Sequence, residues 1–167
     1  MKRVVVLGGG VGGTIVANIV ARRAKDADVT VVDKTGRHVY QPGYLYVAFG
    51  RQQPEKFARP ESRLLRKRVR LIIDEAVRVD DAAKVVHLKS GTILPYDYLV
   101  IATGARIAPE EIPGHEGSHH FYSAEASVKL REALERFQGG RVVVAIGGVP
   151  YKCPPAPAEA ACQLDYY

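Results

Sequence analysis

A glycine-rich turn lies directly between a short apolar run and a stretch with helical spacing, an order that few folds accommodate. The apolar run is residues 3–7, "RVVVL", and the residues that follow place Gly8, Gly10 and Gly13 in a G-x-G-x-x-G pattern. In this pattern the first glycine permits a tight turn, the second lets a pyrophosphate approach the backbone, and the third lets helix and strand pack closely. A helix that starts at such a turn directs amide donors and a partial positive charge at the phosphates. The alternative is an ordinary tight turn with no ligand.

A second apolar run, residues 28–33 with the sequence "DVTVVD", completes a strand, helix, strand unit and ends in an acid. The helix is predicted over residues 12–23, where apolar side chains recur at helical spacing. Asp33 lies 20 residues after Gly13, where a carboxylate can accept hydrogen bonds from ribose hydroxyls. We therefore predict an α/β fold of Rossmann type, with a parallel sheet that binds a nucleotide.

Composition excludes several classes of protein. Hydrophobic residues make up 47% of the 167 residues, and no apolar run approaches the ~18 residues of a membrane-spanning helix. The apolar run at the N-terminus is too short for a secretion signal, and the two cysteines do not form a disulfide framework. We therefore expect a cytoplasmic protein. His115, His119 and His120 lack a partner at metal-ligand spacing, so no metal site is predicted.

The net charge is +6, and the densest basic stretch is residues 63–70, "RLLRKRVR". Such a stretch can attract anionic lipid or nucleic acid, or it can simply be a solvated surface. Aromatic side chains are not interleaved with these charges, as a nucleic-acid platform requires. We interpret the stretch as solvated surface and predict no nucleic-acid partner.

The middle of the chain alternates between irregular and regular stretches. Residues 34–68 carry several prolines and glycines and are predicted to form a long loop with one or two short helices. Residues 69–101 contain short apolar runs separated by turns, which predict a small antiparallel β-meander. It ends in a strand with the sequence "DYLVIA".

The last third of the chain is predicted to contain two helices and one strand. A helix over residues 123–137 begins at an N-capping serine and ends at a glycine pair. Residues 141–146, "RVVVAI", predict a buried strand, and glycines follow it as they follow the first strand. Two prolines then precede a helix predicted over residues 156–163. The predicted domains are a nucleotide-binding domain at residues 1–122 and the start of a second Rossmann-like domain at residues 123–167.

The segment "YDYLVIATGA", residues 96–105, resembles the strand and turn that close the FAD domain in flavoproteins with two dinucleotide-binding domains. In that resemblance the small residues Thr103 and Gly104 let the chain turn close to the cofactor. A buried strand that ends in an ordinary turn is the alternative. Because the segment follows a glycine turn and a meander in the order of that family, FAD is predicted rather than NAD.

The whole chain resembles the N-terminal part of the sulfide:quinone oxidoreductase and flavocytochrome c sulfide dehydrogenase group, within the pyridine nucleotide-disulfide oxidoreductase superfamily. The segments that carry the resemblance are "VVVLGGGVGGTIVANIVAR", "QPGYLYVAFG", "YDYLVIATGARI" and, most specifically, "PYKCPPAPAEAA". Residues 34–60 hold no cysteine, which disfavours the glutathione-reductase-like class with its CxxxxC pair. A full member of the group is more than twice as long, so we expect the N-terminal portion of an enzyme, inactive alone.

The resemblance implies a function as well as a fold. In the sulfide-oxidising group the cysteine that aligns with Cys153 takes part in sulfur transfer near the flavin, and a quinone or cytochrome reoxidises the flavin. The resemblance further implies a homo-oligomer and leaves open peripheral contact with a membrane surface in the full-length form. Two alternatives remain: an NADH:quinone dehydrogenase in which Cys153 is incidental, and a noncatalytic nucleotide-binding module.

The glycine turn, the acid and the resemblance together give one set of predicted FAD contacts. They are Gly8, Gly9, Gly10, Val11, Gly12, Gly13, Asp33, Lys34, Pro42, Gly43, Ala76, Val77, Ala102, Thr103, Gly104 and Arg106.

Of the two cysteines, Cys153 is predicted to be the more reactive. It precedes the predicted helix at residues 156–163, and a helix N-terminus and the adjacent Lys152 both favour a thiolate. Cys162 is expected to be buried and inert, because free cysteine is among the most buried residue types. The alternative is that Cys153 has no reactive role and only packs behind the prolines.

Overall fold

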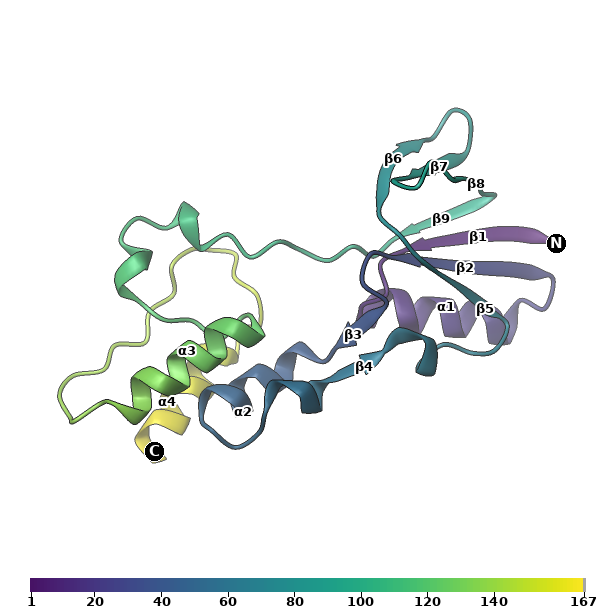
Figure 1. Ribbon diagram of the computed structural model, residues 1–167. Helices are drawn as coiled ribbons and strands as arrows, with labels where there is room; N and C mark the ends of the chain where they lie inside the picture. Colours follow the sequence, from purple (N-terminus) through teal and green to yellow (C-terminus); the bar gives the residue numbers. More distant parts are fainter. Residues whose placement is uncertain (167) are drawn as a thin grey trace. The chain divides into compact units, whose positions relative to one another are not determined.

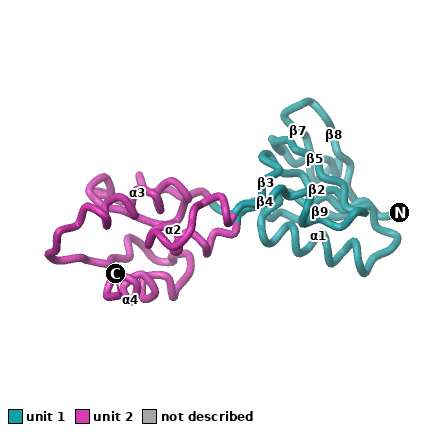
Figure 2. Tube along the Cα trace, turned by 60° about the horizontal axis from the view of Figure 1, so that its bottom comes forward, with its two compact units in different colours: residues 1–39, 58–105 teal, residues 40–57, 106–167 magenta. Residues whose placement is uncertain are grey.

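The computed structural model describes residues 1–166, which form two compact units (Figure 2). The first unit comprises Met1–Val39 and Ala58–Ala105, and the second comprises Tyr40–Phe57 and Arg106–Tyr167. The chain therefore passes from the first unit into the second, returns, and passes into the second again. Each unit is described by itself. The domain boundary predicted between residues 122 and 123 stays a prediction.

A four-stranded parallel sheet forms the centre of the first unit (Figure 1), with strand order β5-β2-β1-β9. Its strands are β1 (Lys2–Leu7), β2 (Ala27–Asp33), β5 (Val69–Ile73) and β9 (Tyr98–Ile101). The helix α1 (Val11–Arg23) connects β1 to β2. The α/β fold, the first two strands and the helix between them are as predicted from the sequence.

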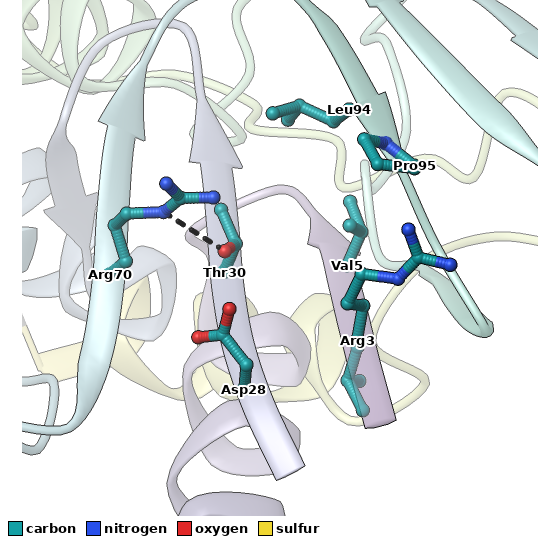
Figure 3. A pocket seen from close by; sticks show the side chains of 8 residues that line it. Arg3, Val5, Asp28, Thr30, Arg70, Leu94 and Pro95 are labelled. Carbon is teal, nitrogen blue, oxygen red and sulfur yellow. Dashed lines mark hydrogen bonds between the residues drawn. The ribbon is translucent and has the colours of Figure 1, made fainter. Parts of the chain in front are cut away.

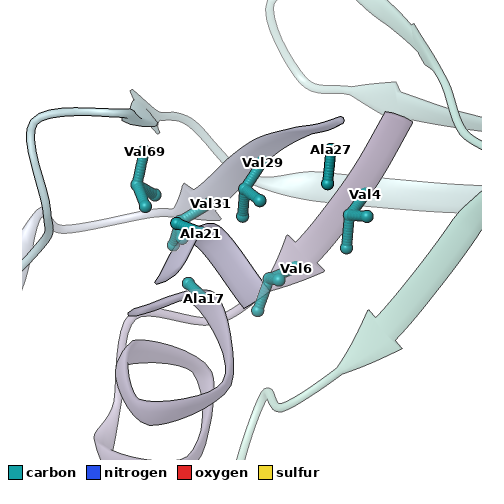
Figure 4. Close-up of a cluster of buried hydrophobic side chains, with 8 residues drawn as sticks. All are labelled: Val4, Val6, Ala17, Ala21, Ala27, Val29, Val31 and Val69. Atoms are coloured by element: carbon teal, nitrogen blue, oxygen red, sulfur yellow. The ribbon is translucent and has the colours of Figure 1, made fainter. Parts of the chain in front are cut away.

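Both faces of this sheet are covered, which explains why its strands are continuous apolar runs rather than alternating ones. Val4 and Val6 of β1 pack with Ala17 and Ala21 of α1 on one face. The side chain of Val5 points the other way and packs on the meander. Figure 4 shows the cluster on the helix side, formed by Val4, Val6, Ala17, Ala21, Ala27, Val29, Val31 and Val69.

The antiparallel meander covers the other face of the sheet. It consists of β6 (Ala76–Asp80), β7 (Val85–Leu88) and β8 (Ile93–Pro95). Val86 and Leu88 of β7 pack against Val5 and Leu7 of β1. The predicted meander is therefore confirmed for its middle strands, β6 to β8, whereas its predicted final strand is β9, which pairs in parallel with β1.

The prediction that residues 69–73 belong to the meander is wrong. These residues form β5, which pairs in parallel with β2, from Val29 opposite Val69 to Asp33 opposite Ile73. The physical reason is visible in the run "VRLII": Val69 and Leu71 pack in the helix-side cluster, whereas Ile72 packs in the meander-side cluster. A strand with apolar side chains on both faces is suited to a sheet that is covered on both faces.

The stretch predicted as a long loop, residues 34–68, contains short regular elements. Two antiparallel strands, β3 (Arg37–Val39) and β4 (Ala58–Pro60), lie where the chain leaves the first unit and returns to it. They were not predicted from the sequence, since three residues are too few to show a period. The short helix α2 (Tyr44–Ala48) and the 3₁₀ turns η1 (Gln41–Gly43), η2 (Pro54–Phe57) and η3 (Glu61–Arg63) make up most of the rest.

The second unit is mainly helical. Its longer helices are α3 (Ala124–Glu135) and α4 (Ala156–Tyr166), α2 packs against α3, and 3₁₀ turns lie at η4 (Pro109–Glu111) and η5 (His115–Gly117). The predicted N-cap of α3 is confirmed, because the Ser123 side chain accepts a hydrogen bond from the Ala126 amide at 3.1 Å. The helix predicted over residues 156–163 is also confirmed, as α4.

The prediction of a buried strand at residues 141–146 is wrong. These residues form no strand, and Val143 is 74% exposed. A parallel strand is held by hydrogen bonds to neighbouring strands, and within residues 1–166 no strand pairs with this run. An apolar sequence alone does not supply that partner strand.

Within residues 1–166 no helix is both long and apolar enough to cross a bilayer.

An ion pair fastens the start of β1 to the start of β9 and gives a pH-dependent prediction. Hydrogen bonds from the Arg3 guanidinium and the Arg3 amide lower the pKa of Asp97 from 3.8 to about 2. A carboxylate with a depressed pKa stabilises the fold above its unfolded pKa and loses that effect as the pH falls towards the folded one. We expect Asp97→Asn to unfold at lower urea concentration than wild type at pH 6. The difference should shrink between about pH 4 and pH 2, and a constant difference would contradict this assignment.

Candidate functional site: the glycine turn and Cys153

The glycine turn lies where three strands of the parallel sheet end. It joins the carboxyl end of β1 to α1, with Asp33 at the end of β2 and Ala102 directly after β9. In the sheet, β2, which is the next strand in sequence, lies on one side of β1, and β9 lies on the other side of β1. Open α/β sheets bind ligands at such a reversal of strand order, at the carboxyl ends of the strands.

Two glycines of the turn have structural reasons to lack a side chain. Gly8 has φ +101°, and a Cβ there would lie 2.3 Å from the Ala102 carbonyl oxygen. A Cβ on Gly13 would lie 1.9 Å from the Gly8 carbonyl oxygen. These contacts hold β1, α1 and the residues after β9 close together.

Gly10 differs, because the space beside it is open. It is the N-cap residue of α1, with φ −74° and ψ −173°, which any residue can adopt. No atom lies within 4 Å of the position that a Cβ would take, and no side chain caps the helix. Gly10, Val11 and Gly12 are exposed. The first turn of α1 thus presents backbone amides beside free space, an arrangement that fits the phosphates of a dinucleotide.

Asp33 contacts the turn directly. Its Oδ2 accepts a hydrogen bond from the Gly9 amide at 2.8 Å, and its Oδ1 accepts from the amides of Thr35 and Gly36. Burial alone raises the pKa of Asp33, but these donors and the Thr35 hydroxyl outweigh it, so the pKa lies below its usual value. The carboxylate is ionised at neutral pH and partly exposed, so Oδ2 can accept a further hydrogen bond.

The predicted cofactor contacts fall into two groups. The first unit holds most of them, and a hydrogen bond and close backbone approaches bring together the glycine turn, Asp33 and Ala102. Lys34, Val77, Thr103 and Gly104 are exposed in the same unit, and Ala76 is partly buried. The second unit holds Pro42, Gly43 and Arg106, and it also holds Cys153, the cysteine predicted to take part in sulfur transfer. Arg106 forms ion pairs with Glu110 and Glu111, and Pro42 and Gly43 lie in η1 before α2.

Cys153 is an exposed free thiol in an unusual backbone conformation. Its φ is 63°, and its carbonyl oxygen accepts a hydrogen bond from the Ala156 amide at 3.0 Å, at the start of α4. The Tyr122 hydroxyl donates to the Lys152 carbonyl oxygen at 2.6 Å. Burial, and then the neighbouring Cys153 and Tyr151, raise the pKa of Tyr122. The Lys152 ammonium group donates to the Gln41 side chain.

The expectation that Cys162 is buried is wrong, because this cysteine is exposed. The buried residues of α4 are Ala156 and Ala160, which lie on one face of the helix. Cys162 follows Ala160 by two positions, about 200° around the helix, and so lies on the opposite face. The burial preference of cysteine is overridden here by its place on the helix.

Sequence analysis missed a buried acid beneath the glycine turn. Glu61 is fully buried, and its carboxylate binds the Thr14 hydroxyl at 2.7 Å and His38 Nδ1 at 3.1 Å. Glu61 lies 47 residues from Thr14 and 23 from His38 in sequence. No local pattern joins residues so far apart, so no signal in the sequence could have identified the cluster.

A small pocket of about 70 Å³ lies away from the glycine turn, at the opposite ends of the strands (Figure 3). Its cationic side chains already have partners, since Arg70 Nε donates to the Thr30 hydroxyl at 3.2 Å and Arg3 pairs with Asp97. Parallel sheets bind their ligands at the carboxyl ends of the strands. The glycine turn is therefore the stronger candidate site.

Comparison with known proteins identifies relatives along most of the chain. The sulfide-quinone reductase of Aquifex aeolicus is 31% identical over 167 residues, which cover 99% of this chain and 39% of that protein. The solved structure of the sulfide:quinone oxidoreductase from Aquifex aeolicus matches with a TM-score of 0.67 and 28% identity, over 81% of this chain and 32% of that one. A type II NADH:quinone oxidoreductase of Mycobacterium tuberculosis is 36% identical over 110 residues, 62% of this chain and 23% of that protein.

The chain thus spans about two fifths of the length of its Aquifex relative. Residues 2–151 match the family described as pyridine nucleotide-disulphide oxidoreductase, and the glycine turn, the parallel sheet and the meander all lie within that range. The chain belongs to the pyridine nucleotide-disulphide oxidoreductase family of FAD-dependent enzymes.

Proposed function

We propose that this chain is the FAD-binding N-terminal portion of an enzyme that oxidises sulfide and reduces a quinone. The observation that carries the proposal is the exposed free thiol of Cys153 at the start of α4. It occurs in a chain that matches sulfide:quinone oxidoreductases over 98% and 99% of its length. A thiol that accepts sulfur from sulfide must be accessible, and this one is.

The glycine turn and Asp33 have complementary proposed roles in holding FAD. The amides at the start of α1 bind the pyrophosphate, and Asp33 Oδ2 accepts hydrogen bonds from the ribose. The remaining predicted contacts, from Lys34 to Arg106, stay proposals. When bound, FAD supplies the two-electron acceptor that sulfide oxidation requires.

Cys153 is proposed to bond to the sulfur of sulfide. One S–H bond of the thiol and one of sulfide would be lost as two protons, and the two electrons given up by the sulfur atoms would pass to FAD and from it to the quinone. Contact with a membrane surface, a cytoplasmic location and a homo-oligomeric state belong to the proposal for the full-length enzyme.

An NADH:quinone oxidoreductase is the second candidate. The observation that favours it is the 36% identity to the type II enzyme of Mycobacterium tuberculosis, although that match covers only 62% of this chain. In this candidate Cys153 has no role in catalysis. The two candidates therefore predict different effects of replacing Cys153: the first predicts loss of sulfide-dependent activity, and the second predicts no effect on catalysis.

The test is turnover by the full-length enzyme after replacement of each cysteine. We expect Cys153→Ser to lower sulfide-dependent quinone reduction by about 100-fold or more, because a hydroxyl cannot take up the sulfur. Cys162→Ser is the matched control, since Cys162 is also exposed, and it should keep wild-type activity. The FAD content should be unchanged in both variants.

Two outcomes would count against sulfide oxidation. If Cys153→Ser keeps sulfide-dependent activity, the cysteine has no redox role. If the wild-type enzyme reduces quinone with NADH but not with sulfide, the second candidate is correct. The 167-residue chain serves as the negative control, because we expect it not to oxidise sulfide.

A further inference from the structure

The most deeply buried charged residue of the first unit lies directly under the glycine turn. The Glu61 side chain is 0% exposed. A Cβ on Gly9 would lie 3.1 Å from Glu61 Cγ and 3.2 Å from Asp33 Cβ, so the turn rests on both acids. A buried carboxylate is costly unless it is hydrogen-bonded, and both oxygens of Glu61 have partners.

These partners also bind the backbone of the turn. His38 Nδ1 lies 3.1 Å from Glu61 Oε2 and 3.0 Å from the Gly9 carbonyl oxygen. Since a carbonyl can only accept, Nδ1 carries a proton and donates. The Thr14 hydroxyl lies 2.7 Å from Glu61 Oε1, 2.8 Å from the Gly10 carbonyl oxygen and 3.2 Å from that of Gly9. A hydroxyl has one proton, so Thr14 donates to one of these oxygens at a time, and the Gly10 carbonyl also accepts the Thr14 amide at 2.9 Å as part of α1. The Gly9 carbonyl is therefore the one that depends on the cluster, through His38 and Thr14.

The orientation of those carbonyls fixes the orientation of the amides that follow them. In a planar trans peptide the C=O and the N–H point in opposite directions. With the Gly9 carbonyl drawn towards the buried cluster, the Gly10 amide points away from it. The exposed side of the turn, where nothing lies within 4 Å of the Gly10 Cβ position, is where a phosphate would be received.

We propose that Thr14, His38 and Glu61 act as positioning residues that orient the Gly10 amide towards the cofactor's phosphates. This inference rests on the placement of the FAD pyrophosphate at the glycine turn. None of the three side chains needs to touch FAD. Glu61 is the residue that joins the other two, so its replacement should free the Gly9 carbonyl.

The experiment compares FAD affinity with stability in the full-length enzyme after removal of FAD. Glu61→Leu should weaken FAD binding, measured by flavin fluorescence, by about 30-fold. Glu61→Gln keeps an acceptor for His38 and a polar partner for Thr14, so it should remain within about 3-fold of wild type. Val86→Ala is the control for lost stability alone, because Val86 is fully buried in the meander-side cluster and belongs neither to the turn nor to the Thr14, His38 and Glu61 cluster. It should unfold more easily and bind FAD as wild type does.

A second pair of variants keeps the proposal falsifiable if Glu61→Leu does not fold. Thr14→Val removes one hydroxyl at constant shape and should weaken FAD binding about 10-fold, whereas Thr14→Ser should restore it. The ³¹P resonances of the bound pyrophosphate should shift in Thr14→Val at saturating FAD, but not in Val86→Ala. A change in amide orientation produces that shift, and a general loss of stability does not.

The results separate this inference from the cofactor placement on which it rests. If Gly10→Val weakens FAD binding while Glu61→Leu and Thr14→Val bind FAD with wild-type affinity and unshifted ³¹P resonances, the positioning role is overturned and the placement stands. If Gly10→Val also binds FAD normally, both are overturned.

Discussion

Gly10→Val is expected to fold as wild type does and to bind FAD about 100-fold more weakly, a loss of about 2.7 kcal/mol. The fold should survive because the Gly10 backbone is extended and the Cβ position is open. Binding should not survive at wild-type strength, because the valine side chain occupies the space in which the pyrophosphate approaches the first turn of α1. Flavin fluorescence titration measures the affinity, and far-ultraviolet circular dichroism checks the fold.

The matched control for Gly10→Val lies outside the turn. Gly91 is exposed, and a Cβ there also meets nothing within 4 Å, but its φ of +90° favours glycine. Gly91→Asn is therefore the tolerable replacement, and it should leave FAD affinity unchanged. Equal affinity in wild type and Gly10→Val would show that the pyrophosphate lies elsewhere.

Gly13→Ala is expected to destabilise the first unit by about 3 kcal/mol or more, or to prevent folding. The added Cβ would lie 1.9 Å from the Gly8 carbonyl oxygen and 3.3 Å from Val6 Cγ1. The oxygen belongs to the backbone, so the clash is relieved only if α1 moves away from β1. That movement would open the helix-side cluster, in which Val6 packs against Ala17. Urea unfolding measures the loss.

Gly12→Ala is the control for Gly13→Ala, because it makes the same chemical change one residue earlier in α1. Its Cβ would meet only Ala102 Cβ, at 3.9 Å, which is an ordinary contact. Replacement of a helical glycine by alanine also favours the helix by up to about 1 kcal/mol. We expect Gly12→Ala to be at least as stable as wild type. A Gly13→Ala protein within 1 kcal/mol of wild type would contradict the close packing described here.

Sequence reasoning was successful where the determining interactions are local. The order of β1, the glycine turn, α1 and β2 could be predicted because each element leaves its own pattern within about ten residues. Ser123 could be recognised as a helix cap for the same reason, since its partner Ala126 is three residues away. The family resemblance added the choice of FAD, which no spacing or composition provides.

Sequence reasoning was unsuccessful where partners are distant in the chain. The run at residues 69–73 shows that it is a strand, but not that its neighbour is β2, some 40 residues earlier. The run at residues 141–146 is apolar enough for a strand, yet within residues 1–166 it has no strand to pair with. Glu61 looks like an ordinary surface acid until the fold brings Thr14 and His38 to it.

The division of the second unit into two chain segments has a consequence for its synthesis on the ribosome. The helix α2 ends at Ala48 and buries Tyr44 and Val47, but its packing partner α3 begins only at Ala124, 76 residues later. At about 5–20 residues per second, the ribosome needs roughly 4–15 s to add them. Through that interval the nascent chain carries the apolar residues of α2 without their packing partner, and we expect this segment to be open to binding by chaperones.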